Sequence, residues 1–411
     1  MDTTPKSNRI HIAFFGLRYA GKSTLVNAFC SQSLAIVSPT PGTTTDPDSK
    51  AMEILPLGPC LITDTAGLDD EGELGAQRVE KTLEILNTTD IAVWVRGESE
   101  STQNYESDEF NESNEWAKRF FDICKRKNIL VFEYRRGEDV EELKKKIAEV
   151  KLEEKVPGLL DGLVQKGDRV ICVCPIDSSA PKGRLILPQV QVIRECLDLH
   201  VPCTVVQPDE LEREIRDERL EIRDERLEIR DKRLDKVGRV LVITDSQAME
   251  KVKQILPLSH SHSSLPLKLT TFSILFARQK GDFAEFVRGV KAIKALKDGD
   301  TVLISEACTH RRHCEDIGTT KIPKAVMALS GCQKLNFAFS SGATFNPDTM
   351  RSLGTHASLI VHCGGCMLTR RELLHRIALA KAAKVPIVNY GVVLSAAAGM
   401  TEFNENGIIG T

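Results

Sequence analysis

Short hydrophobic runs alternate with longer amphipathic stretches over the first 165 residues. The expected strands are Ile10–Phe15, Leu61–Thr63, Ile91–Val95 and Ile129–Phe132. The expected helices are Lys22–Phe29, Gly75–Leu86, Asn114–Lys125 and Val140–Lys151. Strands that alternate with helices in this way are typical of a mainly parallel sheet with crossover helices. The pattern therefore predicts an α/β domain over residues 1–165.

Two further regions continue this α/β pattern. Residues 166–258 contain the expected strands Arg169–Val173 and Val240–Thr244 and the expected helix Gln189–Leu197. Residues 259–411 contain the expected strands Thr301–Ser305, Leu359–Val361 and Ile387–Val388, and the expected helices Phe283–Leu296 and Arg370–Ala383. A chain of 411 residues also exceeds what one hydrophobic core normally supports. We therefore predict two smaller α/β domains after the first.

A charged heptad repeat interrupts the second region within residues 212–235. The pattern E-I-R-D-[EK]-R-L occurs three times between Glu214 and Leu234. On a helix its isoleucines and leucines would form two separate stripes, which is not the seam of a coiled coil. Like charges four residues apart, such as Glu214–Glu218 and Arg219–Arg223, oppose helix formation. We expect an extended, solvated helical insertion.

The composition narrows the class of protein. With 41% hydrophobic and 27% charged residues the chain is typical of a globular protein, and a net charge of −3 argues against nucleic-acid binding. No apolar stretch approaches the roughly 18–20 residues of a membrane span, and the start shows no signal peptide. We therefore expect a cytoplasmic protein whose 12 cysteines are thiols or metal ligands. Four of them show no ligand spacing and are expected to pack as small hydrophobes, namely Cys172, Cys174, Cys196 and Cys203.

A complete phosphate-binding loop follows the first expected strand. Gly16-Leu-Arg-Tyr-Ala-Gly-Lys-Ser23 matches G-x-x-x-x-G-K-S and leads into an expected helix. In such a loop, backbone N–H groups and the helix N-terminus surround the phosphates. Lys22 is expected to reach the β- and γ-phosphates, and the Ser23 hydroxyl to ligate Mg²⁺.

Two companion motifs stand at suitable distances along the chain. Asp64-Thr-Ala-Gly67 follows an expected strand, so Asp64 is expected to hold Mg²⁺ and the Gly67 N–H to sense the γ-phosphate. Thr44, in the segment between the two motifs, is expected to complete the magnesium shell. The expected catalytic residues are Lys22, Thr44 and Gly67. The expected nucleotide-binding residues are Gly16, Arg18, Tyr19, Ala20, Gly21, Lys22, Ser23, Thr24, Asp64 and Gly67.

These motifs resemble the small GTPases of the group that includes Era and the tRNA-modifying GTPase. The resemblance implies that the chain binds and hydrolyses GTP. Three departures matter. The first is the base-recognition region, where no N-K-x-D motif for guanine occurs from Val131 onward and the compressed segment between Val95 and Leu143 looks short of a strand. Tyr19 stands where potassium-activated relatives carry Asn, and Leu68 stands where Ras-like enzymes have a water-positioning Gln. We therefore expect slow hydrolysis, with the nucleotide acting mainly as a switch.

A cysteine–histidine cluster marks the last region. Cys308-Thr-His310 follows one expected strand, and His362-Cys363-Gly-Gly-Cys366 follows another. Soft thiolates at strand ends suit an iron–sulfur cluster or zinc. His310 and His362 are both candidates for a fourth ligand. On chemistry alone three interpretations stay open: an iron–sulfur cluster, a zinc site, and buried cysteines that hold no metal.

The whole arrangement resembles the FeFe-hydrogenase maturation GTPases, the HydF family. The cysteine motif carries this resemblance, together with Pro175–Gln189, Thr244–Gln247, Glu315–Gly318, Lys321–Pro323 and Asn389–Gly391. It implies that 1–165 is a P-loop GTPase domain, 166–258 a dimerisation domain and 259–411 an iron–sulfur cluster-binding domain.

The resemblance also implies ligands and partners. A 4Fe–4S cluster would be held by Cys308, Cys363 and Cys366, and a transient di-iron precursor of the H-cluster would be carried to apo FeFe-hydrogenase. Two radical-SAM maturases and the chain's own copies, in a homodimer or tetramer, are the other implied partners, with no nucleic acid and no membrane.

Two other functions stay open at this point. One is a zinc- or iron–sulfur-stabilised GTPase of the Era group that acts in RNA or ribosome assembly. The other is a redox iron–sulfur enzyme with its own substrate. The absence of a radical-SAM C-x3-C-x2-C triplet from the sequence argues against it.

Overall fold

A computed structural model describes most of the chain. The described residues are 6–30, 48–70, 72–97, 112–150, 157–176, 183, 185–215, 238–246, 248–260, 267–307, 317–342, 345, 357–400 and 409–410. Two compact units emerge, one of Met1–Lys155 with Met367–Glu372 and the other of Val156–Cys366 with Leu373–Thr411. Each unit is described by itself.

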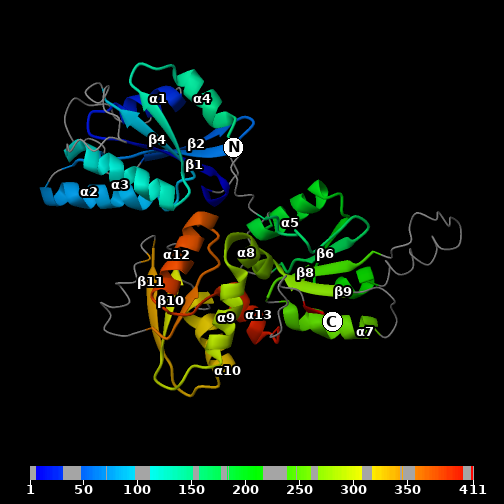
Figure 1. The fold of residues 1–411 in the computed structure, drawn as a ribbon. Helices are drawn as coiled ribbons and strands as arrows, with labels where there is room; N and C mark the ends of the chain where they lie inside the picture. The colour runs from blue at the N-terminus through cyan, green and yellow to red at the C-terminus, as the bar shows by residue number, and fades with distance from the viewer. Residues whose placement is uncertain are drawn as a thin grey trace, which may run out of the picture. The chain divides into compact units, whose positions relative to one another are not determined.

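The first unit is built on a sheet of five strands in the order β2-β3-β1-β4-β5 (Figure 1). The strands are β1 (Ile10–Phe15), β2 (Asp48–Ile54), β3 (Gly58–Asp64), β4 (Ile91–Arg96) and β5 (Leu130–Arg135). All neighbouring pairs are parallel except β2 and β3. The helices are α1 (Lys22–Cys30), α2 (Gly72–Ile85), α3 (Glu112–Arg126) and α4 (Val140–Ala148), after a short 3-10 turn η1 (Lys6–Asn8). The expected α/β fold of this region is confirmed.

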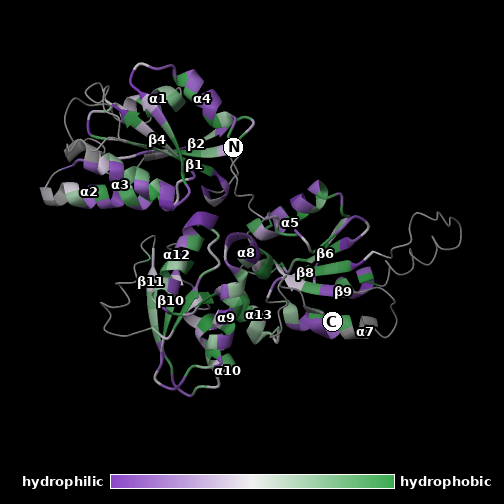
Figure 2. Cartoon of the chain, viewed as in Figure 1, coloured by the Kyte–Doolittle hydropathy of each residue, from purple (hydrophilic) through white to green (hydrophobic). Residues whose placement is uncertain are grey.

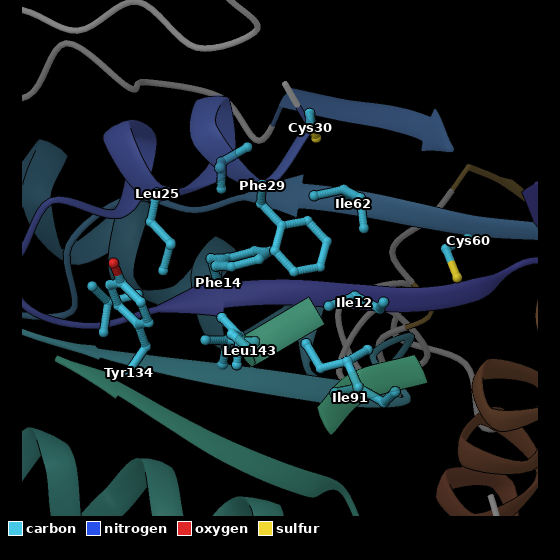
Figure 3. Packing of buried hydrophobic residues seen from close by; sticks show 14 of the residues in the cluster. Ile12, Phe14, Leu25, Phe29, Cys30, Cys60, Ile62, Ile91, Tyr134 and Leu143 are labelled. Atoms are coloured by element: carbon cyan, nitrogen blue, oxygen red, sulfur yellow. The ribbon is translucent and has the colours of Figure 1, made fainter. Parts of the chain in front are cut away.

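Alternate residues of β1 belong to two hydrophobic cores, one on each face of the sheet. Ile12 and Phe14 pack with α1 and α4, where the Phe14 and Phe29 rings lie 5.4 Å apart (Figure 3). Ala13 and Phe15 pack with α2 and α3 on the other face. Residues 12–15 of the central strand β1 are therefore apolar on both faces, whereas the helices that cover the sheet are amphipathic (Figure 2).

The second unit begins with a sheet in the order β14-β9-β8-β6-β7. Its strands are β6 (Arg169–Val173), β7 (Cys203–Val206), β8 (Val240–Thr244), β9 (Leu267–Thr271) and β14 (Ile409–Gly410). Its helices are α5 (Leu187–Asp198), α7 (Met249–His260) and α8 (Phe272–Lys280). β9 pairs with β8, so this sheet continues past residue 258, where the sequence suggested a boundary.

The cysteines of this sheet lie in its core, as expected. Cys172, Cys174 and Cys196 are buried among apolar side chains of β6, α5 and α8, and the half-buried Cys203 packs against them. Burial raises the pKa of the Cys174 thiol to about 12. Thiols that stay protonated in apolar surroundings are inert, which fits a packing role.

A second sheet of the same unit is wholly parallel, in the order β11-β10-β12-β13. Its strands are β10 (Thr301–Glu306), β11 (Asn336–Ser341), β12 (Leu359–His362) and β13 (Ile387–Asn389). Its helices are α9 (Phe283–Ile293), α10 (Ile322–Ser330), α12 (Arg370–Ala382) and α13 (Tyr390–Ala397), with a π-helical turn η3 (Ile317–Lys321) before α10. The carboxyl ends of β10 and β12 meet at one edge, where Ser305 pairs with His362.

Several expected features lie outside the described residues. They are Thr44, Cys308, His310 and all but the first residues of the heptad repeat. Among the helices that the structure describes, none has the length and apolar character needed to cross a membrane.

Candidate functional site

The phosphate-binding loop has a backbone that requires glycine at two positions. Gly16 has φ 150°, and a Cβ on it would lie 2.5 Å from the Val95 carbonyl oxygen of β4. Gly21 has φ 91°, which side chains rarely adopt. The sequence motif therefore reflects backbone geometry at the carboxyl end of β1.

Three residues from α1 and β3 converge beside this loop. The Lys22 ammonium donates to the carbonyls of Gly16 at 3.1 Å and Leu17 at 2.7 Å. The Ser23 hydroxyl donates to the Asp64 carboxylate at 2.6 Å. Asp64 is 0% exposed. A hydroxyl and a carboxylate oxygen held together in this way are ligands that suit Mg²⁺.

The segment after Asp64 packs directly on the phosphate-binding loop. A Cβ on Gly67 would lie 2.6 Å from Cγ of Arg18, so only glycine fits there. The Arg18 N–H donates to the Asp69 carboxylate at 2.6 Å, and the Arg18 guanidinium lies 3.6 Å from the Asp70 carboxylate. A change in one segment must therefore move the other. The sequence did not single out Asp69 and Asp70, because their place after Gly67 is the only sign in the sequence that they contact the phosphate-binding loop.

Leu68, which follows Gly67, is a core residue of the first unit. Its side chain is fully buried in the core with Leu17 and Phe120, and its N–H donates to the Gly16 carbonyl at 3.3 Å. A buried leucine supplies no group that orients water.

The remaining expected nucleotide residues differ in their exposure. Tyr19 has φ 62° and is 68% exposed, while Ala20 is buried in the loop. Thr24 is exposed on α1. The end of β5 carries no guanine-recognition aspartate: Tyr134 is buried there, and its hydroxyl donates to the Glu138 carbonyl at 2.8 Å.

Cys363 lies where β10 and β12 end. Its N–H donates to the Ser305 carbonyl at 2.8 Å, and its Sγ accepts from the Ala307 N–H at 3.3 Å. Ala307 immediately precedes Cys308 in the chain. The Cys363 sulfur is thus in contact with the residue that leads into the other half of the cysteine motif.

His362 is fully buried, and both of its ring nitrogens have neighbours. Nε2 lies 3.2 Å from the Arg376 guanidinium, which can only donate. Nδ1 therefore carries the proton and donates to the Cys363 carbonyl at 2.7 Å. In this arrangement His362 supports the Cys363 backbone, and its role as a fourth ligand stays a prediction, as does that of His310.

A buried lysine holds the other end of the C-G-G-C loop. Lys280, at the end of α8, is 4% exposed and donates to the carbonyls of Gly365 at 3.4 Å and Cys366 at 3.3 Å. Burial lowers the pKa of Lys280 to about 8, against the opposing effect of Cys366. Lys280 and Arg376 were missed from the sequence because lysine and arginine on helices normally indicate solvated faces.

The cysteine loop suits thiolate ligation. Cys366 is exposed and Cys363 is half-buried, so both sulfurs remain accessible. Among the described residues no group of three Cys, His or acidic side chains is placed to hold a metal ion. Two of the three expected cysteine ligands are described, and the third, Cys308, is not.

Three protein families match successive parts of the chain. The 50S ribosome-binding GTPase family matches residues 11–155. The hydrogen maturase F dimerization domain matches residues 159–234 and 222–281, and the hydrogen maturase F tetramerization domain matches residues 284–403.

Individual relatives match a short segment. The tRNA modification GTPase MnmE of Methylobacterium sp. (strain 4-46) is 41% identical over 78 residues, 18% of this chain and 18% of that protein. GTPase Der of Campylobacter hominis is 34% identical over 84 residues, 20% of this chain and 18% of that protein. The chain thus spans about a fifth of the length of these curated relatives.

A solved structure of Era from Aquifex aeolicus is similar at 15% identity with a TM-score of 0.25, covering 84% of this chain and 98% of that one.

The family matches agree with the geometry of both sites. The phosphate-binding loop, with Lys22, Ser23 and Asp64 brought together, lies within the GTPase match, and the cysteine loop lies within the tetramerization match. The first domain is accordingly a P-loop GTPase domain. Since the two following domains are those of hydrogen maturase F, the chain belongs to the hydrogen maturase F family.

Proposed function

We propose that this protein is a GTP-dependent scaffold for the maturation of FeFe-hydrogenase. Cys308, Cys363 and Cys366 would hold a 4Fe–4S cluster, and the protein would carry the di-iron precursor of the H-cluster as cargo to apo-hydrogenase. The observation that carries the proposal is the contact of the Cys363 sulfur with the residue before Cys308, inside a family-specific domain.

The number of thiolates supports a carrier role. Clusters of the 4Fe–4S type normally have four cysteine ligands. Three cysteines leave one iron without a thiolate, and that position is available for an exchangeable ligand. The Lys280 contacts and the His362–Cys363 contact support the backbone of the loop.

The nucleotide site supports a switch rather than rapid turnover. Lys22, Ser23 and Asp64 provide phosphate and Mg²⁺ contacts, whereas the buried Leu68 leaves the attacking water unoriented. GTP would change the segment after Asp64, which the Arg18–Asp69 hydrogen bond joins to the phosphate-binding loop.

Self-association and two enzymes complete the proposal. The matched domains are named for dimerization and tetramerization, which supports a homodimer or tetramer. Two radical-SAM maturases would supply the precursor in the cytoplasm, where thiols stay reduced. The relatives that act in tRNA modification match only the GTPase domain, so they do not favour a function in RNA assembly.

Anaerobic metal analysis with EPR tests the cluster part of the proposal. The wild type should bind about four irons per chain, and Cys363→Ser with Cys366→Ser should lose them. Cys332→Ser is the matched control, because its thiol donates to the Leu296 carbonyl at 3.3 Å, away from the loop. Zinc in place of iron, or iron that survives the double substitution, would overturn the proposal.

Transfer is tested separately. Protein produced together with the two maturases should activate apo-hydrogenase, and the double variant should not. Wild-type protein that binds iron but never activates apo-hydrogenase would refute the carrier role alone.

A further inference from the structure

Two buried cationic side chains approach the loop Cys363–Cys366 from different helices. Arg376 of α12 is 1% exposed, and its guanidinium lies 3.2 Å from Nε2 of His362, the residue before the loop. Lys280 of α8 is 4% exposed and contacts the carbonyls of Gly365 and Cys366 directly. Lys280 is therefore the cation in direct contact with the loop that bears the thiolates.

The position of Lys280 is fixed by the packing of α8. Thr271 caps this helix, accepting from the Ile274 N–H at 3.1 Å. On the other side a Cβ at Gly391 of α13 would lie only 2.3 Å from Cβ of Ser273, so the two helices are in close contact. The Lys280 ammonium also lies 5.6 Å from the centroid of the Phe276 ring. An ammonium held by these contacts has little freedom to turn away from the loop.

A buried positive charge favours the more negative state of whatever lies beside it. Each cysteine thiolate brings one negative charge to a cluster, and one-electron reduction adds another. The reduced state therefore gains more from a nearby ammonium than the oxidised state does. Main-chain carbonyls hold the ammonium without cancelling its net charge.

We propose that Lys280 is a positioning residue that holds the Cys363–Cys366 loop and raises the reduction potential of the cluster bound there. This inference rests on the proposed function, since it requires an iron–sulfur cluster on the loop. It adds a residue that lies within the dimerization-domain match to the cluster site, so the site is complete only when α8 is packed beside the cysteine loop.

A redox titration followed by EPR, with dithionite as reductant at pH 7, tests the inference on the full-length protein. Lys280→Met keeps an unbranched stem of similar length and removes the charge. Its equilibrium constant for one-electron reduction should fall at least tenfold, a decrease of 59 mV in the midpoint potential. Lys280→Arg retains the charge and should stay near the wild-type potential.

Arg278→Met is the matched control. Arg278 is a cation of the same helix, but its guanidinium donates to the carbonyls of Leu159 at 3.3 Å and Asp161 at 3.0 Å, away from the cysteine loop. Its loss should leave the midpoint potential unchanged.

The outcomes separate this inference from the proposed function. A wild type without an iron cluster would refute the proposed function, and this inference with it. Clusters of equal potential in the wild type and Lys280→Met would overturn the inference alone. Iron lost from Lys280→Met but kept by Lys280→Arg would support it, whereas iron lost from both variants would indicate a packing role and overturn the role of charge.

Discussion

Replacing Ser23 by alanine removes the hydroxyl that joins α1 to the buried carboxylate at the end of β3. The hydrogen bond from Ser23 to Asp64 is 2.6 Å long, and its acceptor is a fully buried charge. Hydrogen bonds to charged groups contribute about 1.5–3 kcal/mol, and more when a buried partner loses them. We expect the free energy of unfolding of the first unit to fall by about that amount in the absence of nucleotide.

The same change should weaken nucleotide binding in a magnesium-dependent way. When Mg²⁺ is bound, the Ser23 hydroxyl would become a ligand and the Asp64 carboxylate would lie beside the ion. A loss of about 1.5–3 kcal/mol corresponds to roughly 10- to 150-fold in affinity. Without Mg²⁺ the hydroxyl has no ion to bind, so the affinities of variant and wild type should differ much less.

Tryptophan fluorescence isolates the first unit in a urea titration. The chain has two tryptophans, Trp94 and Trp116, and both lie in that unit. With a slope of about 1–3 kcal/mol per molar urea, the midpoint should fall by about 1 M. Ser330→Ala is the control, because its hydroxyl makes a neutral 3.2 Å hydrogen bond to Met327 in the other unit. An unchanged midpoint together with an unchanged affinity for Mg²⁺–GDP would refute the reasoning.

Three further predictions concern the other elements. Gly16→Ala would place a Cβ against the β4 backbone, at a residue whose φ is positive. The resulting strain should lower the free energy of unfolding by about 1–3 kcal/mol and abolish binding of a fluorescent GTP analogue. Burial would raise the pKa of Asp168, but hydrogen bonds from Arg239 and from backbone N–H groups outweigh this effect and lower it. The contribution of Asp168 is then present above pH of about 4 and lost as pH falls through the folded pKa. Asp168→Asn should therefore cost about 1–2 kcal/mol in urea unfolding at pH 7 and progressively less as the pH falls below about 4. Val205 is 43% exposed on the edge strand β7, so Val205→Glu should weaken self-association in sedimentation velocity.

Elements with a strong local pattern were predictable from the sequence. β1 and α1 begin at the expected residues because the glycines of the phosphate-binding loop separate an apolar strand from a helix. β2 was missed since its sequence, DSKAMEI, has charged residues that suit an edge strand and no continuous apolar run. α8 was missed because FSILFARQK is buried on most of its surface, so it shows no polar face.

The cysteine loop was predictable from the sequence, but the side chains that support it were not. Cys363 and Cys366 are recognisable because the C-x-x-C spacing is local in sequence. Lys280 reaches the same loop from 86 residues away, and Arg376 reaches His362 from a helix that follows it. Such contacts depend on how β9, β12 and their helices pack, and no local pattern in the sequence encodes them.

The nucleotide site and the cysteine loop share one electrostatic arrangement. Each lies at the carboxyl end of a parallel strand, where the chain leaves the sheet and its polar groups face outward. Each loop also has a buried lysine whose ammonium donates to two loop carbonyls: Gly16 and Leu17 for Lys22, and Gly365 and Cys366 for Lys280. Carbonyl dipoles orient an ammonium but leave its net charge available to an anion. For Lys22 that anion would be a phosphate, and by the same reasoning the guest of the cysteine loop should be negatively charged, as a thiolate-bound cluster is.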